Sequence, residues 1–116
     1  MKRGFYFIII NDTDKNGNTF NKPDLREGSY EYHGKLFIHR DNDYRHNPNK
    51  WKVSHLDSGS NIAHDKSLPE ARRIAKQLQG FSFWELKTHQ ALSDAVRSPS
   101  YEDQVIKIKK ILNLSV

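Results

Sequence analysis

The segment 51–80 constrains the fold more than any other part of the chain, because it reads as strand, tight turn, strand and capped helix. Side chains alternate between two faces from Trp51 onward, as they do in a strand. Ser58-Gly59 is the predicted centre of the turn, and this register places Val53 opposite His64. We expect one face to pack under the helix that follows, with these members: Trp51, Val53, His55, Ile62 and His64.

The helix that follows has clear start and stop signals. Ser67 and Glu70 form a capping box, and Pro69 is tolerated because first-turn amides have no partner within a helix. Gly80 is a natural C-terminal stop. Apolar side chains at helical spacing predict the buried stripe: Leu68, Ala71, Ile74, Ala75 and Leu78.

The N-terminal half contains two further hairpin signals. Residues 5–10 are apolar on both faces, which predicts a central strand covered on both sides. Asn16-Gly17 is a strong turn dipeptide within a polar stretch. Residues 29–32 and 35–38 flank His33-Gly34, so we expect a second hairpin centred on these two residues.

The C-terminal third is predicted to be helical. Ser82 and Glu85 offer another capping box, from which we expect a helix up to Pro99. Ser100 then begins a last helix with Val105 and Ile108 on its apolar side. The predicted fold class is therefore α+β, in a single domain over residues 1–116. An antiparallel sheet of four to five strands from the N-terminal half is packed by two to three C-terminal helices.

Charge and composition narrow the classes of partner. The 116 residues carry a formal charge of +5, which favours polyanions or an acidic protein surface. With no cysteine, disulfides and thiolate zinc sites are excluded, and a cytoplasmic protein is expected. The longest apolar run is too short to span a membrane, so we expect no membrane partner.

Two stretches carry residues that bind metals in other proteins. Residues 12–18 resemble the first half of a calcium loop, but Pro23 stands where the bidentate acid is due, so we interpret them as a plain turn. Pro23-Asp24 also predicts a break in the local structure. A metal-dependent hydrolase would need a second cluster to converge: His39, Asp41, Asp43 and His46. Their spacing matches no metal enzyme, so we expect neither a metal nor a cofactor.

Two groups of residues suit a nucleic-acid surface. Tyr30 and Tyr32, with Lys35 in the same hairpin, could stack bases and follow phosphates, or the rings could be core. Three cations lie outside the apolar stripe of the capped helix: Arg72, Arg73 and Lys76. They predict either a phosphate-facing surface or a solvated helix face.

The motif Trp51-Lys52-Val53-Ser54-His55, followed by Ser58-Gly59, Ile62 and Glu70-Ala71, resembles a pattern in small proteins of phages and mobile elements. In outline it is also similar to the sheet-plus-helix unit of integrase arm-binding and plant ethylene-response DNA-binding domains. The resemblance implies a sheet that enters the major groove while the helix braces it. It also implies these groove-facing positions: Lys52, Ser54 and Asn61. Leu56 and Ala63 would share that face.

These observations lead to a non-enzymatic binding protein as the expected function. Nucleic acid is the first predicted partner, in a phage or mobile-element setting. The alternative is an inhibitor of a host defence system, similar to an anti-CRISPR protein, which would grip an acidic patch or a ribonucleoprotein. The small metal-dependent hydrolase described above is the third prediction.

Overall fold

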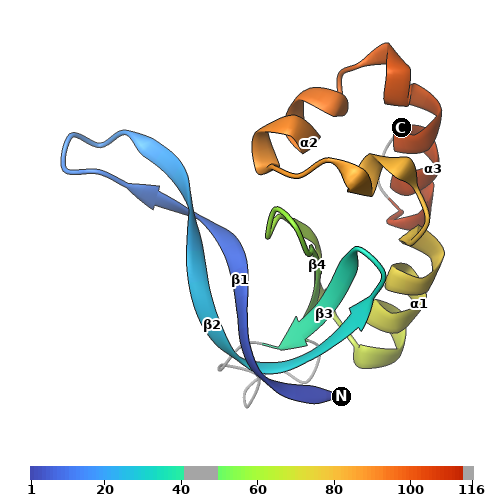
Figure 1. Ribbon diagram of the computed structural model, residues 1–116, viewed down its shortest axis with the longest axis horizontal. Helices are drawn as coiled ribbons and strands as arrows, with labels where there is room; N and C mark the ends of the chain where they lie inside the picture. The colour runs from blue at the N-terminus through green and yellow to red at the C-terminus, as the bar shows by residue number, and fades with distance from the viewer. Residues whose placement is uncertain (41–49, 114–116) are drawn as a thin grey trace.

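A computed structural model of the protein, which describes residues 1–40 and 50–113, contains a five-stranded antiparallel sheet (Figure 1). Each strand pairs with the next one along the chain, so the order β1-β2-β3-β4-β5 is that of a meander. The bounds are β1 Lys2–Thr13, β2 Thr19–His33, β3 Leu36–Arg40, β4 Trp51–His55 and β5 Asn61–Lys66.

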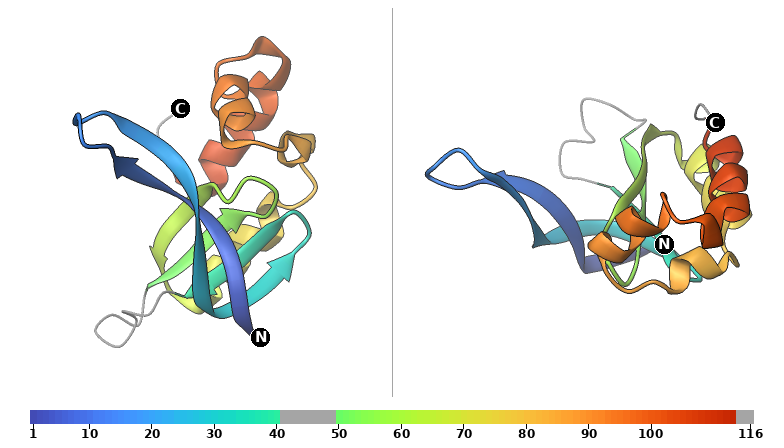
Figure 2. Two further views of the ribbon diagram at one scale, coloured as in Figure 1. Left: turned by 60° about the vertical axis from the view of Figure 1, so that its left-hand side comes forward. Right: turned by 90° about the horizontal axis from the view of Figure 1, so that it is seen from above.

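Helices follow the sheet and cover one part of it. The three α-helices are α1 Leu68–Leu78, α2 His89–Ala95 and α3 Glu102–Ile111, and two 3₁₀ turns, η2 Ser82–Glu85 and η3 Pro99–Tyr101, precede α2 and α3. Helix α1 packs on β3 and β4, and α3 packs on α1 (Figures 1 and 2). The predicted α+β class is therefore confirmed. Among the described residues, no helix combines the length and the apolar character needed to cross a bilayer.

The main core lies between α1 and the sheet. Leu36 and Ile38 of β3 face this core together with Trp51 and Val53 of β4, and each is at most 5% exposed. The other face of β3 is covered by a smaller cluster of Tyr6, Ile8 and Phe37. Strand β3 is thus buried on both faces. The sequence pattern predicts such a central strand at residues 5–10 instead.

The predicted central strand at residues 5–10 is wrong, because β1 is an edge strand of the sheet. Tyr6 and Ile8 are buried, whereas Phe5 and Phe7 on the opposite face are 63% and 61% exposed. A run that is apolar on both faces is buried on both only where other elements cover it, and none of the elements in the described part of the chain covers Phe5 and Phe7. The sheet order, which local sequence does not encode, decides this outcome.

The hairpin that joins β1 to β2 has the predicted plain turn. Asp14 Oδ1 accepts hydrogen bonds from the amides of Asn16 (2.8 Å) and Asn18 (3.0 Å). Gly17 has φ +84°, the left-handed region that glycine tolerates. The predicted break at Pro23 is wrong, because β2 continues through it. Strand β3 pairs only with the far end of β2, so at Pro23 this edge has no partner strand among the described residues.

The second hairpin turns one residue later than predicted. His33 pairs with Leu36, so Gly34-Lys35 forms the two-residue loop in place of His33-Gly34. Gly34 has φ +62°, and a hairpin loop with glycine at its first central position meets the need for a positive φ there.

The turn between β4 and β5 is longer than predicted. The His55 amide donates to the Ser60 carbonyl at 2.8 Å, and the Gly59 amide donates to the His55 carbonyl at 2.8 Å, which closes a loop of residues 56–59. Val53 therefore pairs with Ala63 and not with His64. The shorter turn places His64 on the packed face and Ala63 on the opposite face. Both assignments are wrong, because His64 is exposed and Ala63 is buried in the main core.

Helix α1 follows the prediction closely. Ser67 Oγ accepts the Glu70 amide at 3.3 Å, and the predicted stripe is buried or packed against the core. The predicted helix from Ser82 is wrong: η2 is a single 3₁₀ turn, and α2 begins after Thr88, whose Oγ1 accepts the Ala91 amide at 3.0 Å. The last helix is confirmed as α3, with Val105 and Ile108 buried.

Candidate functional site

Residues 4–28 form most of the β1–β2 hairpin, and we call them the arm: its base packs on the body through Tyr6 and Ile8, and its turn end projects from the body (Figure 2). Phe7 pairs with Leu25 and Ile9 pairs with Pro23, so the apolar side chains of both strands share one face of the arm. We call these apolar side chains the arm face: Phe5, Phe7, Ile9, Pro23 and Leu25. Glu27, which pairs with Phe5, lies beside them. Phe5 is 63% exposed, Phe7 61% and Leu25 53%, which makes the arm face an unusual accumulation of solvent-exposed apolar side chains.

The arm is held to the body by the loop between β4 and β5. The Ile9 amide donates to the Gly59 carbonyl at 2.8 Å. Gly59 has φ +72°, and a Cβ atom there would lie 2.9 Å from the Ile9 nitrogen. Only glycine allows the two backbones to approach this closely.

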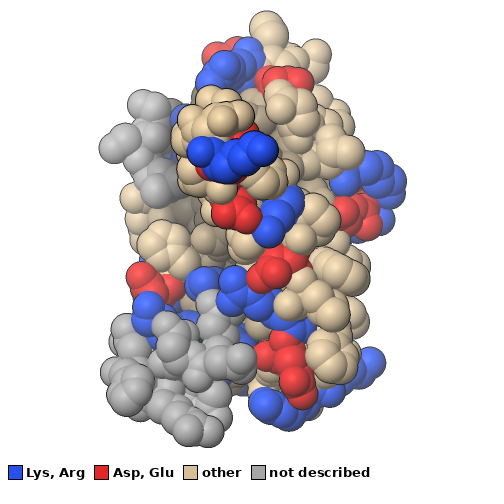
Figure 3. Space-filling view, turned by 90° about the vertical axis from the view of Figure 1, so that its left-hand side faces the viewer, with Lys and Arg blue, Asp and Glu red and all other residues tan. Residues whose placement is uncertain are grey.

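The charges of the arm nearly cancel. It contains three basic and four acidic residues: Lys15, Lys22, Arg26, Asp12, Asp14, Asp24 and Glu27. Lys22 pairs with Asp12 at 2.8 Å and Arg26 with Asp24 at 2.5 Å. The hydrogen bond from Lys22 lowers the pKa of Asp12. Figure 3, seen from the side of the arm, shows acidic and basic side chains interspersed over this face. The arm is therefore a poor surface for a phosphate backbone.

The predicted basic face of α1 is largely neutralised by carboxylates. Arg72 binds Glu31 of β2 through two contacts, Nε to Oε2 at 3.1 Å and Nη2 to Oε1 at 3.0 Å. The Arg72 hydrogen bond is the main cause of a lowered Glu31 pKa, and His33 adds to it. Arg73 binds Glu70 and Gln77 on its own helix. Lys76 is exposed on the same helix.

The hairpin aromatics divide between core and surface. Tyr30 is half-buried and its ring centroid lies 6.1 Å from that of Tyr6. Tyr32 is 49% exposed and its ring lies 5.3 Å from Tyr30. Lys35 is not beside them on the sheet, because it lies in the turn and pairs with Asp57 at 3.2 Å.

The three positions implied by the DNA-binding resemblance do not form one exposed row. Ser54 is 1% exposed, and its hydroxyl lies 2.8 Å from Nε2 of the buried His39, so its groove-facing assignment is wrong. Lys52 is half-buried on β4 opposite His39, and Asn61 is exposed at the start of β5. Leu56 lies in the loop and Ala63 in the core.

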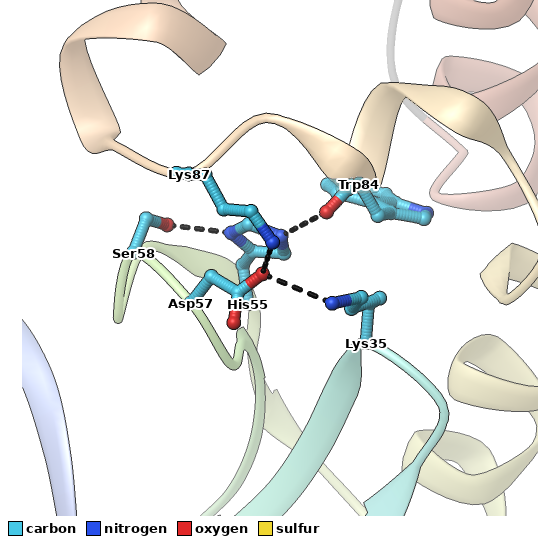
Figure 4. A network of polar contacts seen from close by, with 6 residues as sticks. All are labelled: Lys35, His55, Asp57, Ser58, Trp84 and Lys87. Atoms are coloured by element: carbon cyan, nitrogen blue, oxygen red, sulfur yellow. Dashed lines mark hydrogen bonds and ion pairs between the residues drawn. The ribbon is translucent and has the colours of Figure 1, made fainter.

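A polar network surrounds the loop between β4 and β5 (Figure 4). Asp57 Oδ2 lies 3.2 Å from both Lys35 Nζ and Lys87 Nζ. The Lys87 hydrogen bond is the largest of the causes that lower the Asp57 pKa. Beneath them the fully buried His55 binds Ser58 Oγ through Nδ1 (2.7 Å) and the Trp84 carbonyl through Nε2 (2.6 Å). Burial lowers the His55 pKa.

The network continues to a residue that sequence reasoning missed. Ser58 Oγ lies 2.7 Å from Ser60 Oγ, which lies 2.8 Å from Nδ1 of His89 at the start of α2. His89 lines an apolar pocket of about 280 Å³. No local motif marks it, since its partners come from a loop 29 residues away in sequence.

The predicted histidine–aspartate cluster lies mostly outside the described residues. Asp41, Asp43 and His46 are not among them, and His39 is fully buried. Within residues 1–40 and 50–113, no group of three side chains is placed to hold a metal ion.

Comparison with known proteins finds no match to a protein-family model, to a curated protein or to a solved structure. The resemblance to integrase and ethylene-response domains therefore stays a prediction.

Proposed function

We propose that the protein is a non-enzymatic binding protein whose arm face docks on another protein. One observation carries the proposal: Phe5, Phe7 and Leu25 are each more than half exposed on the outer face of the β1–β2 hairpin. Exposed apolar surface of this kind, on an element with balanced charge, is typical of a protein interface. Large apolar side chains in such patches often supply most of the binding free energy.

The overall charge indicates the chemistry of the partner. The protein carries a formal charge of +5, although the arm itself is nearly neutral. A partner with an apolar strip on an acidic surface would match both properties. Two copies of this chain would instead repel each other at long range, which disfavours self-association.

Nucleic acid is the second candidate, and the surface of α3 favours it. Lys107 and Lys110 are exposed on this helix, and Lys109 is half-buried. Such a basic cluster can bind phosphates without a sequence preference. Arg72, Arg73 and Lys35 contribute less than expected, because carboxylates already neutralise them.

A co-purification experiment separates the two candidates. The double variant Phe5→Ser, Phe7→Ser should lower capture of the partner from host lysate at least about tenfold, because two anchoring aromatics are lost. Nuclease treatment should leave capture unchanged. Leu56→Ser is the matched control, since Leu56 is 40% exposed but lies outside the arm.

Two results would contradict docking through the arm. The first is capture that survives the double variant, and the second is capture that nuclease abolishes. Light scattering on the purified protein would reveal a dimer if the arm face binds a second copy.

Three further predictions from the sequence stand next to this proposal: the inhibitor, the phage setting and the hydrolase. An inhibitor that grips a CRISPR nuclease would be one example of a partner-docking protein, and it stays a prediction, as does the phage setting. The hydrolase also stays a prediction, since most of its residues lie outside the described part of the chain.

A further inference from the structure

The pocket beside His89 is large enough for a small ligand. It lies between the start of β5, η2, α2 and the inner side of α3, with Phe83, Trp84 and Leu92 on its walls and a volume of about 280 Å³. An apolar cavity of about 150 Å³ is enough for benzene. This pocket can therefore take one aromatic ring system of up to two fused rings.

The hydrogen bonds of His55 fix where its proton lies. His55 is fully buried and its pKa is lowered, so the ring is neutral near pH 7 and carries one N–H. Nε2 lies 2.6 Å from the Trp84 carbonyl, which can only accept, so Nε2 holds the proton. Nδ1 is then an acceptor, and the Ser58 hydroxyl, 2.7 Å away, must donate to it.

The position of the proton on His55 also determines the direction of each hydrogen bond from Ser58 to His89. The single hydroxyl proton of Ser58 is used at His55, so in the contact between the two serine hydroxyls Ser60 is the donor. Ser60 Oγ then accepts from His89, which requires the proton of that ring to lie on Nδ1. In the neutral ring, Nε2 of His89 is then left as an acceptor, and none of the described residues bonds it.

We propose that the pocket binds a small aromatic compound with one N–H or O–H donor. The ring would lie against Phe83 and Trp84, and the donor would bond Nε2 of His89. Both features are preorganised in the ligand-free protein. The walls are core residues, and the series of hydrogen bonds from the Trp84 carbonyl to His89 fixes the acceptor. The proposal is independent of the arm, because no residue of the arm lines the pocket.

A matched pair of ligands tests the proposal on the unmodified protein. Indole has the N–H donor, and benzothiophene has nearly the same shape without it. In a nuclear magnetic resonance titration, indole should bind about fivefold more tightly, as one net hydrogen bond of about 1 kcal/mol predicts. Shifts should centre on Trp84, Leu92 and Ile108. Equal affinities, or no saturable shift up to the solubility limit, would overturn the proposal.

A variant and a direct proton measurement complete the test. His89→Phe keeps a ring but removes the acceptor, so it should equalise the two ligands, whereas Gln90→Ala on the same helix should keep the fivefold ratio. If His89→Phe does not fold, a proton–nitrogen correlation spectrum of the wild-type imidazoles decides. It should show His89 protonated at Nδ1 and His55 at Nε2. If the neutral ring of His89 carries its proton on Nε2, the proposal is wrong.

Discussion

Gly59 is the residue on which the position of the arm depends. Its loop touches β1 where the Ile9 amide meets the Gly59 carbonyl at 2.8 Å. Sequence reasoning found Gly59 as a turn residue but not this contact. The two segments are about fifty residues apart, and no local pattern reports such an approach.

Replacing Gly59 should be costly. In Gly59→Ala, the new Cβ would meet the Ile9 nitrogen at 2.9 Å and two Ile8 atoms at 3.0 Å, with φ at +72°. We expect the free energy of unfolding to fall by more than about 2 kcal/mol, measured by urea denaturation. Gly80→Ala is the control, because φ is +96° there but nothing lies within 4 Å. It should cost only about 1 kcal/mol. Equal losses would contradict the close approach.

His55 should make stability depend on pH. Burial lowers its pKa below the ordinary value of 6.5, so the unfolded chain binds the proton more readily than the folded state. The free energy of unfolding should therefore be highest above pH 6.5 and fall as the pH drops below it. Urea midpoints recorded across this range would show the effect, and His55→Gln should reduce it.

The carboxylates act in a separate window. The pKa of Glu31 is lowered from its ordinary value of 4.5, so its stabilising effect is present above pH 4.5 and is lost only at lower pH. A pH profile that stays flat until the carboxylates titrate would contradict the role assigned to His55.

At the scale of elements, local signals predicted α1 and failed at residues 82–85. Ser67 caps α1 and its apolar stripe meets the core, so the local and tertiary requirements agree. Ser82 shows the same capping pattern, but the chain leaves the helical path after Glu85. Phe83 and Trp84 are buried in the main core, and the Trp84 indole donates to the Leu78 carbonyl at 2.8 Å. Packing overrode the local preference there.

The contact between α1 and β2 is a further testable element. Arg72 and Glu31 form a two-point ion pair with 47% and 21% of their side chains exposed. A double-mutant cycle with Arg72→Ala and Glu31→Ala should give a coupling of about 0.5 to 1 kcal/mol, because solvent screens part of the attraction. The coupling should shrink in high salt. A value near zero at low salt would show that the pair does not help to hold α1 on the sheet.

At the scale of the whole molecule, the sequence predicted the fold class but not the arm. Alternation, turn dipeptides and caps are local, and together they indicated an α+β fold. The elements that cover each face of a strand depend on the order of strands in the sheet. The apolar pattern at residues 5–10 therefore does not distinguish an edge strand from a central strand. The candidate site was missed for the same reason: the arm face and the pocket beside His89 both arise from contacts distant in sequence.

Neighbouring residues of β1 should respond in opposite ways to truncation. Phe7 is 61% exposed and Ile8 is 8% exposed, on opposite faces of the arm. Phe7→Ala should change the free energy of unfolding by less than about 0.5 kcal/mol, whereas Ile8→Ala should lower it by about 2 kcal/mol or more. Guanidinium denaturation of the two variants would measure both. A large loss for Phe7→Ala would mean that Phe7 is covered in solution, contrary to an available arm face.

The bond from Ile9 to Gly59 also makes the attachment of the arm observable without any substitution. The Ile9 amide points away from β2, so the antiparallel alternation directs the amides of Phe5 and Phe7 to the same outer edge. In native-state hydrogen exchange, the Ile9 amide should be protected for as long as the arm stays attached, and its exchange rate then reports the free energy of detachment. A partner that pairs along this edge would slow the exchange of Phe5 and Phe7, and a partner that grips only the side chains would not.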